Sequence, residues 1–245
     1  MSDQQNPYQA PQSDLSRPEM IEGGSIEATL AGKASLDVGV VLGEAWDRLK
    51  GSKRILLGGF LLIYLAMFVV IGGLGALLGL NNADPGKSIL WQLIIQLLAL
   101  AIIYPFMAGV ILTAARHMAG QPIAFADLFA NYGNPAKLVG AGLLVQLLTM
   151  IGFVLFIIPG IYLSVAYVLT GALIAERKMG VWEAMEASRK IVTKHWLSVF
   201  AIGLVVGFAM GVSALFLAIP LIWTMPWGLL CLGVVYRNLA GVIAR

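Results

Sequence analysis

Residues 138–175 read LVGAGLLVQLLTMIGFVLFIIPGIYLSVAYVLTGALIA and contain no Asp, Glu, Lys or Arg. A continuous helix of this length would extend about 57 Å, roughly twice the 30 Å thickness of a bilayer's hydrocarbon core. Pro159 and Gly160 lie near the middle of the segment, and both residue types break helices and suit turns. The segment therefore predicts two membrane-crossing helices that fold back on each other at Pro159-Gly160.

Three further apolar runs without acidic or basic residues surround this segment, at residues 55–80, 89–114 and 197–236. Burying a charge at the bilayer centre costs roughly 2.5–3.5 kcal/mol, so membrane-crossing segments exclude charge. The first two runs each fit one crossing, and the third is long enough for two, with Pro220 near its middle. Six spans are thus predicted, at about 55–80, 89–115, 138–158, 161–176, 197–218 and 221–237.

The composition agrees with a polytopic membrane protein. Apolar residues make up 59% of the 245 residues and charged residues 12%, with a mean hydropathy of +0.86. A soluble domain has about twice that share of charged residues. The basic residues flank the spans and form no separate domain, so the net charge of +3 does not indicate nucleic-acid binding. The single cysteine, Cys231, excludes a disulfide framework.

The distribution of basic residues predicts the topology. With six spans, the termini and the loops after the second and fourth spans lie on one side of the membrane. Every Lys and Arg except Lys87 falls on that side. Because cytoplasmic loops carry the excess of basic residues, both termini are expected in the cytoplasm.

The chain divides into a tail and one domain. Residues 1–34 are rich in Gln, Pro and Ser and poor in large apolar residues, so we expect a disordered cytoplasmic tail. Residues 35–245 are expected to form a single six-helix transmembrane domain. Within it, a short amphipathic stretch precedes each pair of spans, at residues 36–49, 122–132 and 181–194. The predicted fold is therefore an all-α membrane protein of three hairpins, each preceded by an interfacial amphipathic helix.

Two details support a threefold repeat. Each pair of spans ends in an arginine followed closely by a glycine: Arg116 and Gly120, Arg177 and Gly180, Arg237 and Gly241. The third amphipathic stretch is the clearest, with one face formed by Val181, Ala184, Met185, Ser188, Ile191 and Val192. Glu186 and Lys190 are spaced for an ion pair on its polar face. Such a helix is expected in the headgroup plane, and the alternative is insertion into the bundle from the cytoplasmic side.

The sequence offers little catalytic chemistry. Glu176, at a cytoplasmic end, is the only ionisable carboxyl group in the predicted spans, and the two histidines, His117 and His195, flank basic residues at the membrane boundary. Hydrolases and metalloenzymes need clustered nucleophiles, bases or ligands. We therefore expect no catalytic residues, no bound metal and no cofactor.

Two groups of uncharged residues inside the spans are candidate functional positions. Gln92, Gln96 and Gln146 form a possible polar patch that lines a path for a small solute, although hydrogen bonds between helices are the favoured role. Glycines at four-residue spacing form a groove on one face of the fifth span: Gly203, Gly207 and Gly211. Packing within the bundle is the favoured role of this groove, and an oligomer interface is the alternative.

Residues 158–163 (IPGIYL), followed by Glu176-Arg177 and by EAMEAS at residues 183–188, resemble a block found in a family of bacterial inner-membrane proteins, the YciC-like proteins. The membrane domain of some glycerophosphodiester phosphodiesterases is similar. The resemblance covers residues 36–245 and implies a six-span protein of the bacterial inner membrane without catalytic residues. The soluble phosphodiesterase domain that sometimes accompanies the related membrane domain does not occur in this sequence.

Two functions follow as hypotheses. The favoured one is a non-enzymatic inner-membrane protein with an assembly, scaffolding or envelope-maintenance role, whose partners are membrane lipids and possible copies of itself or other membrane proteins. The alternative is a small permease or lipid-handling protein for a neutral or amphiphilic substrate. A polar cavity past the three glutamines would favour transport, and a closed, dry bundle would favour scaffolding.

Overall fold

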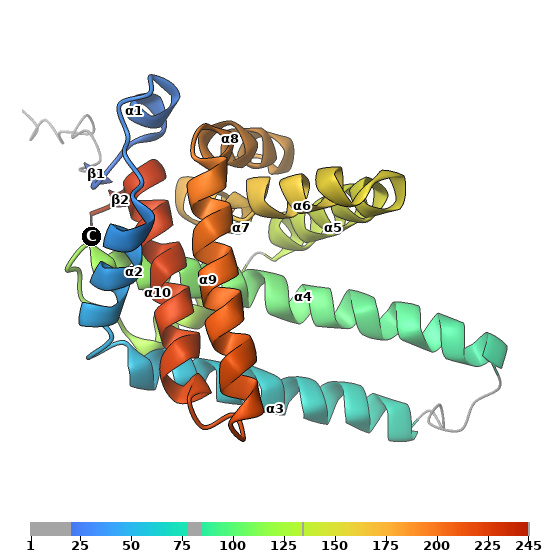
Figure 1. The fold of residues 1–245 in the computed structure, drawn as a ribbon. Helices are drawn as coiled ribbons and strands as arrows, with labels where there is room; N and C mark the ends of the chain where they lie inside the picture. Colours follow the sequence, from blue (N-terminus) through green and yellow to red (C-terminus); the bar gives the residue numbers. More distant parts are fainter. Residues whose placement is uncertain (1–20, 78–84, 134, 245) are drawn as a thin grey trace, which may run out of the picture.

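The computed structural model describes residues 21–77, 85–133 and 135–244. These residues are almost entirely helical, with one two-stranded antiparallel ladder (Figure 1). In chain order the elements are β1 (Ile21–Glu22), α1 (Ile26–Leu30), α2 (Val38–Asp47), α3 (Lys53–Leu77), α4 (Pro85–Met118), η2 (Phe125–Gly133), α5 (Ala136–Leu155), α6 (Ile157–Ala166), α7 (Thr170–Arg177), α8 (Val181–Lys194), α9 (Trp196–Leu215), α10 (Leu221–Leu239) and β2 (Val242–Ile243). The all-helical class is confirmed.

Five segments of the described chain are long and apolar enough to cross a membrane. They are Lys53–Leu77, Trp91–Met118, Ala136–Leu155, Ile157–Arg177 and Trp196–Leu215. These helices are compatible with an integral membrane protein, and their number indicates a multi-pass protein. The predicted sixth span, at residues 221–237, forms helix α10 but is not one of these five. More than half of the residues of α10 are buried inside the protein.

The turn of the middle hairpin lies earlier than predicted. Helix α5 ends at Leu155, and Phe156 adopts an extended conformation with φ −160° before α6 begins. Pro159 is the third residue of α6, where proline is tolerated because the first-turn N–H groups have no helical partner. Gly160 packs against Gly152, whose added Cβ would lie 3.0 Å from the Gly160 backbone. The prediction of a turn at Pro159-Gly160 was therefore wrong: these residues start the returning helix.

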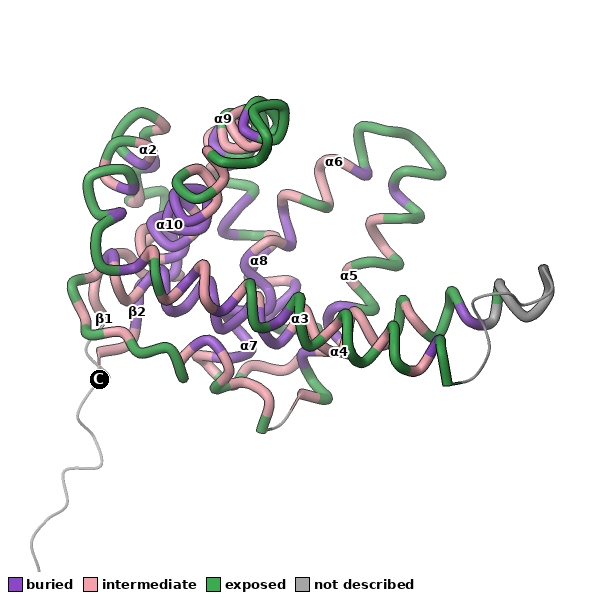
Figure 2. Tube along the Cα trace, turned by 90° about the horizontal axis from the view of Figure 1, so that it is seen from below, coloured by how far each residue is buried: buried purple, intermediate pink, exposed green. Residues whose placement is uncertain are grey.

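The three hairpins α3–α4, α5–α6 and α9–α10 diverge from a common region (Figures 1 and 2). Figure 1 shows α9–α10 running across the direction of α3–α4, and Figure 2 shows α5–α6 pointing away from both. The common region, here called the central core, consists of residues 106–118 of α4, all of α7 and residues 227–239 of α10. Most of the buried apolar side chains of helices α4, α7 and α10 lie in these three stretches. The molecule is thus a packed core with three projecting hairpins.

The predicted interfacial helices form with different geometries. Residues 181–194 form α8 with the predicted bounds, and five of the six residues of the predicted face are buried, all but Val181. The Glu186–Lys190 ion pair is present, with 3.4 Å between Oε1 and Nζ. Helix α8 packs on α1, α5, α6 and α7. Residues 36–49 contain α2, and the middle stretch forms the 3₁₀ helix η2.

The predicted tail is partly ordered. Residues 1–20 lie outside the described part of the chain, but from Ile21 onward the chain packs against the C-terminal segment. Strand β1 pairs with β2, the Gly24 N–H donates to Arg237 O at 2.9 Å, and Thr29 Oγ1 donates to Leu239 O at 2.7 Å. We call this set of contacts the terminal clip. The prediction of disorder through residue 34 is corrected, because these hydrogen bonds to a distant segment order a stretch that has few apolar residues of its own.

The terminal clip leads to a first testable prediction. A Cβ on Gly24 would lie 1.9 Å from Asn238 O, so Gly24→Ala should detach β1 and α1. We expect faster proteolysis within residues 21–35 of the detergent-purified protein and a loss of about 1–3 kcal/mol in the free energy of unfolding. Gly43→Ala is the control, because a Cβ there meets no atom within 4 Å. Equal resistance of both variants to proteolysis within residues 21–35 would contradict the terminal clip.

Candidate functional site

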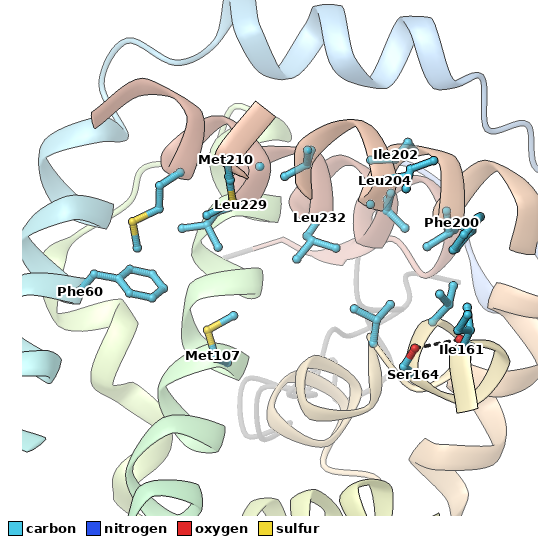
Figure 3. A pocket seen from close by; sticks show the side chains of 18 of the residues that line it. Phe60, Met107, Ile161, Ser164, Phe200, Ile202, Leu204, Met210, Leu229 and Leu232 are labelled. Carbon is cyan, nitrogen blue, oxygen red and sulfur yellow. Dashed lines mark hydrogen bonds between the residues drawn. The ribbon is translucent and has the colours of Figure 1, made fainter. Parts of the chain in front are cut away.

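A cavity of about 580 Å³ lies where the three hairpins leave the central core (Figure 3). Five helices line it: α3, α4, α6, α9 and α10. Figure 3 shows the ring of Phe60 and the side chain of Met107 on one side, with Ile161 and Phe200 on the other. Residues distant in sequence thus meet around one space, which we call the central cavity.

The walls of the central cavity are apolar. No charged residue lines it, and Ser164 Oγ donates to the Ile161 carbonyl of its own helix at 2.8 Å. An apolar cavity does not retain water, because each ordered water needs two to four polar partners. The cavity is partly open to its surroundings, so an apolar chain can enter it. It suits hydrocarbon and offers nothing that would stabilise an ion.

The three glycines of α9 that were predicted to pack against a neighbouring helix have open space beside them instead. Gly203 lines the central cavity, and a Cβ added to Gly203, Gly207 or Gly211 would meet no atom within 4 Å. The groove on α9 therefore packs against no other described helix, which corrects the favoured expectation of packing inside the bundle. The close approach lies elsewhere: a Cβ on Gly233 of α10 would lie 2.6 Å from the backbone carbon of Ala114.

The three predicted glutamines do not converge on the central cavity. Gln92 and Gln96 are exposed on α4. Gln146 lies in a separate open groove of about 630 Å³ between α4 and α5, which Leu100 and Tyr104 also line. Neither Gln92 nor Gln96 lines this groove. The structure thus separates Gln146 from the other two glutamines, and the described residues enclose no polar channel around the three.

One end of the central cavity is continuous with a ladder of aromatic rings. Phe200, which lines the cavity, stacks on Trp196 with 5.0 Å between ring centroids and 8° between planes, and Trp196 stacks on Tyr162 at 6.2 Å. Trp196 Nε1 donates to Tyr162 O at 3.3 Å. Tyr162 Oη and Thr193 Oγ1 are 2.8 Å apart. The ladder leads from apolar wall to polar surface at the junction of α8 and α9.

Charged groups surround this junction. Arg189 binds both carboxylate oxygens of Glu186, at 3.0 and 2.8 Å, and these hydrogen bonds are the main cause that lowers the pKa of Glu186. Lys190 shares the same carboxylate. Burial lowers the pKa of His195, which favours its neutral form. Helix α8 thus carries three cations, Arg189, Lys190 and Lys194, and two carboxylates, Glu183 and Glu186.

A second polar cluster ties the central core together. Arg237 Nη1 and Nη2 donate to the two carboxylate oxygens of Glu44 at 2.6 and 2.8 Å, and Nη1 also donates to Met118 O at 2.6 Å. The hydrogen bonds from Arg237 lower the pKa of Glu44 against the opposing effect of burial. Arg48 reaches the same Met118 carbonyl at 2.8 Å. The end of the first hairpin is thereby fastened to the end of the third.

The middle hairpin joins the same network. Arg177 donates to Ala240 O, and Tyr236 Oη donates to Glu176 Oε2 at 2.6 Å. Glu176 Oε1 accepts from the Ile243 N–H at 3.3 Å. Two of the three repeated arginines, Arg177 and Arg237, therefore each fasten the end of another hairpin. The repeat of Arg and Gly in the sequence pointed to these positions without revealing their partners, and Glu44 carried no sequence signal.

The described residues contain no cluster of three or more His, Cys, Asp or Glu that would hold a metal ion. No family model matches the chain, and neither a curated protein nor a solved structure matches it.

Proposed function

We propose that this chain is a multi-pass protein of the bacterial inner membrane that binds a lipid by placing an acyl chain in the central cavity. The observation that carries the proposal is the cavity itself, with its volume of about 580 Å³, its apolar walls and its partly open boundary. The protein acts by binding and not by catalysis. Both termini lie in the cytoplasm, as the distribution of basic residues favours.

The chemistry of the cavity walls supports a hydrocarbon occupant. The cavity is partly open, so molecules that surround the protein can enter it. Water finds few polar partners on these walls. Lipid chains are the apolar molecules that surround a membrane-embedded cavity. The volume also falls within the 300–1,000 Å³ typical of ligand sites.

A scaffolding role is the second candidate, and one observation favours it. The open glycines Gly207 and Gly211 lie on α9 beside exposed large apolar side chains such as Phe208. A helix of a partner protein or of a second copy can approach closely along such a face. The diverging hairpins, however, do not form the closed bundle that scaffolding alone would favour. Membership of the YciC-like family remains a proposal based on residues 158–188.

The cavity assignment is tested by filling the space. Gly203 lines the cavity and a Cβ there meets no atom within 4 Å, so Gly203→Phe places a ring in the cavity without a backbone clash. Native mass spectrometry of protein purified in mild detergent should show bound phospholipid on the parent chain and at least about tenfold less on Gly203→Phe, a loss of about 1.4 kcal/mol in binding free energy.

Gly211→Phe is the matched control, because Gly211 lies on the same face of α9 with equal room but does not line the cavity. It should retain lipid at the parental level. Equal lipid on both variants, or a parent chain without lipid, would refute the proposed function. A change of oligomeric state in Gly211→Phe alone would support the scaffolding candidate.

A further inference from the structure

We propose that the hairpins α5–α6 and α9–α10 are re-entrant: each enters the hydrocarbon core of the bilayer from the cytoplasmic side, turns within it and returns to the same side. Of the three hairpins, α3–α4 is then the one that crosses the membrane. The surfaces that carry this inference are the two hairpin tips, residues 153–159 and 214–219, and the partner that they fit is lipid hydrocarbon. The inference rests on the membrane location in the proposed function but not on the occupant of the central cavity.

The side chains of both hairpin tips are apolar and uncovered. Every residue of the two tips is exposed, including Ile158 at 80% and Leu215 at 82%. Neither tip contains a polar or charged side chain. Exposed apolar surface of this kind marks contact with a membrane or a protein partner, and in water it would promote aggregation. Lipid hydrocarbon is the surrounding that leaves these side chains stable.

The turn of the first hairpin has the opposite character. Residues 81–87 read NNADPGK, a composition typical of turns in water. Lys87 is the one basic residue that falls on this side of the predicted topology. The sequence of the first turn therefore suits the aqueous phase beyond the membrane, whereas the tips of the other two hairpins suit the membrane interior.

The backbone of both tips provides internal partners for its polar groups, which hydrocarbon requires. The N–H of Phe156 donates to the last turn of α5 at 3.0 Å, and the N–H of Ile219 donates to Phe216 O at 3.2 Å. Pro159 and Pro220 have no N–H to satisfy. Both turns thus reduce the number of backbone donors that need water.

The tip of α9–α10 also retains apolar residues where the backbone favours others. Leu217 and Ala218 have positive φ angles of 54° and 59°, a conformation that glycine, asparagine and aspartate adopt at lower cost. A turn in water typically uses those residues. The polar side chains that flank this tip, Ser213 and Thr224, bind each other, with 3.1 Å between their hydroxyl oxygens. The turn therefore accepts backbone strain and remains apolar.

The directions of the hairpins favour the same arrangement. Hairpin α9–α10 runs across α3–α4, and α5–α6 points away from both (Figures 1 and 2). Membrane-crossing helices tilt by about 20° on average and rarely beyond about 40°, so three hairpins that diverge in this way cannot all stand along the bilayer normal. Helix α6 has ten residues and extends about 15 Å, half the thickness of the hydrocarbon core. A tip that lies within the bilayer agrees with both observations.

The proposal is tested by the depth of spin labels on the full chain in vesicles of phosphatidylethanolamine and phosphatidylglycerol. Ile158→Cys and Leu215→Cys place a label at each tip. Leu204→Cys marks the exposed middle of α9, and Lys87→Cys marks the turn of the first hairpin. The parent chain is the blank, because its one cysteine, Cys231, is buried. Collisions of the label with a water-soluble nickel chelate report water, and collisions with dissolved oxygen report hydrocarbon.

We expect labels at both tips to collide with the nickel chelate about tenfold less often than the label of Lys87→Cys, because hydrocarbon excludes charged and hydrated molecules. Their collisions with the chelate and with oxygen should match those of Leu204→Cys. If α9 crossed the membrane, Leu204→Cys would be shielded from the chelate and Leu215→Cys would be accessible to it.

High access of the nickel chelate to Ile158→Cys or Leu215→Cys would overturn the inference for that hairpin while the proposed function stands. Low access of both the chelate and oxygen to a tip would show that protein covers it, and would overturn its assignment to lipid. If Lys87→Cys were itself shielded from the chelate, α3–α4 would not cross the membrane. That result would refute the multi-pass location in the proposed function.

Discussion

Replacing Gly233 with leucine should abolish the accumulation of folded protein. The Cβ of any side chain at this position would lie 2.6 Å from the backbone carbon of Ala114, 2.7 Å from the Ala115 nitrogen and 2.8 Å from the Ala114 Cβ. Contacts this short force α4 and α10 apart, because backbone atoms cannot rotate away. These two helices form the centre of the core, so separating them exposes many buried apolar side chains at once.

The expected magnitude is large relative to the total stability. Overpacking a core costs typically 1–3 kcal/mol, and occasionally more where side chains cannot rearrange. We expect Gly233→Leu to lower the free energy of unfolding by more than about 3 kcal/mol. This is a large share of the 5–15 kcal/mol that stabilises a typical domain. Size-exclusion chromatography of a fluorescent fusion in detergent measures the outcome as loss of the monodisperse peak.

Gly207→Leu is the matched control for this prediction. It makes the same substitution within a long apolar helix, but a Cβ at Gly207 meets no atom within 4 Å. The control should elute as the parent chain does. A parental peak and melting temperature for Gly233→Leu would show that α4 and α10 do not approach as closely as the structure places them.

Arg237→Met should cause the second large loss. It removes two hydrogen bonds to Glu44 and one to the Met118 carbonyl. The side chains of Arg237 and Glu44 are only 16% and 23% exposed, so the carboxylate loses its main partner in a mostly buried position. Breaking a fully buried pair costs about 3–5 kcal/mol, and partial solvent access reduces the expected loss here to about 2–3 kcal/mol. Thermal unfolding in detergent measures it.

Two measurements separate the ion pair from a packing effect. Glu44→Gln/Arg237→Met should be less destabilised than the sum of the two single variants, because no unpaired carboxylate remains. The pH dependence gives a second readout. Arg237 holds the pKa of folded Glu44 below its ordinary 4.5, so this stabilisation is fully present above that value and is lost as pH falls toward the lowered pKa. The pairing would be contradicted if the stability losses of the two single variants added up to that of the double variant. It would also be contradicted if Arg237→Met lost stability at acidic pH in the same way as the parent chain.

The exclusion of charge from lipid explains why the sequence predicted the helices well. Helix α3 begins at Lys53, two residues before the predicted span at residues 55–80, and continues to Leu77, the last described residue before position 85. Helix α8 matches its prediction at both ends, because three-four spacing of apolar residues distinguishes its two faces. Charge-free runs and the spacing of apolar residues are local signals, because the polarity of each residue depends on whether water, lipid or protein surrounds that residue.

The features that the sequence did not predict depend on contacts between distant residues. The order of residues 21–30 requires hydrogen bonds to Arg237 and Leu239. The glycines at positions 203, 207 and 211 have the spacing of a packing groove, but spacing does not show which helix faces them. Gly233 has no such pattern, yet a Cβ there would lie 2.6 Å from the backbone of Ala114 in a neighbouring helix. The central cavity combines side chains from five helices, so no single stretch of the sequence predicts it.

The terminal clip also has a consequence for biogenesis. Ile21 pairs with Ile243, and all three hairpins lie between these two residues in the chain. During synthesis, which runs from the amino terminus, the segment that contains β1 therefore stays unpaired until the third hairpin has been made. A nascent chain that stalls before α10 would expose a free β1 to the quality-control proteases of the cell.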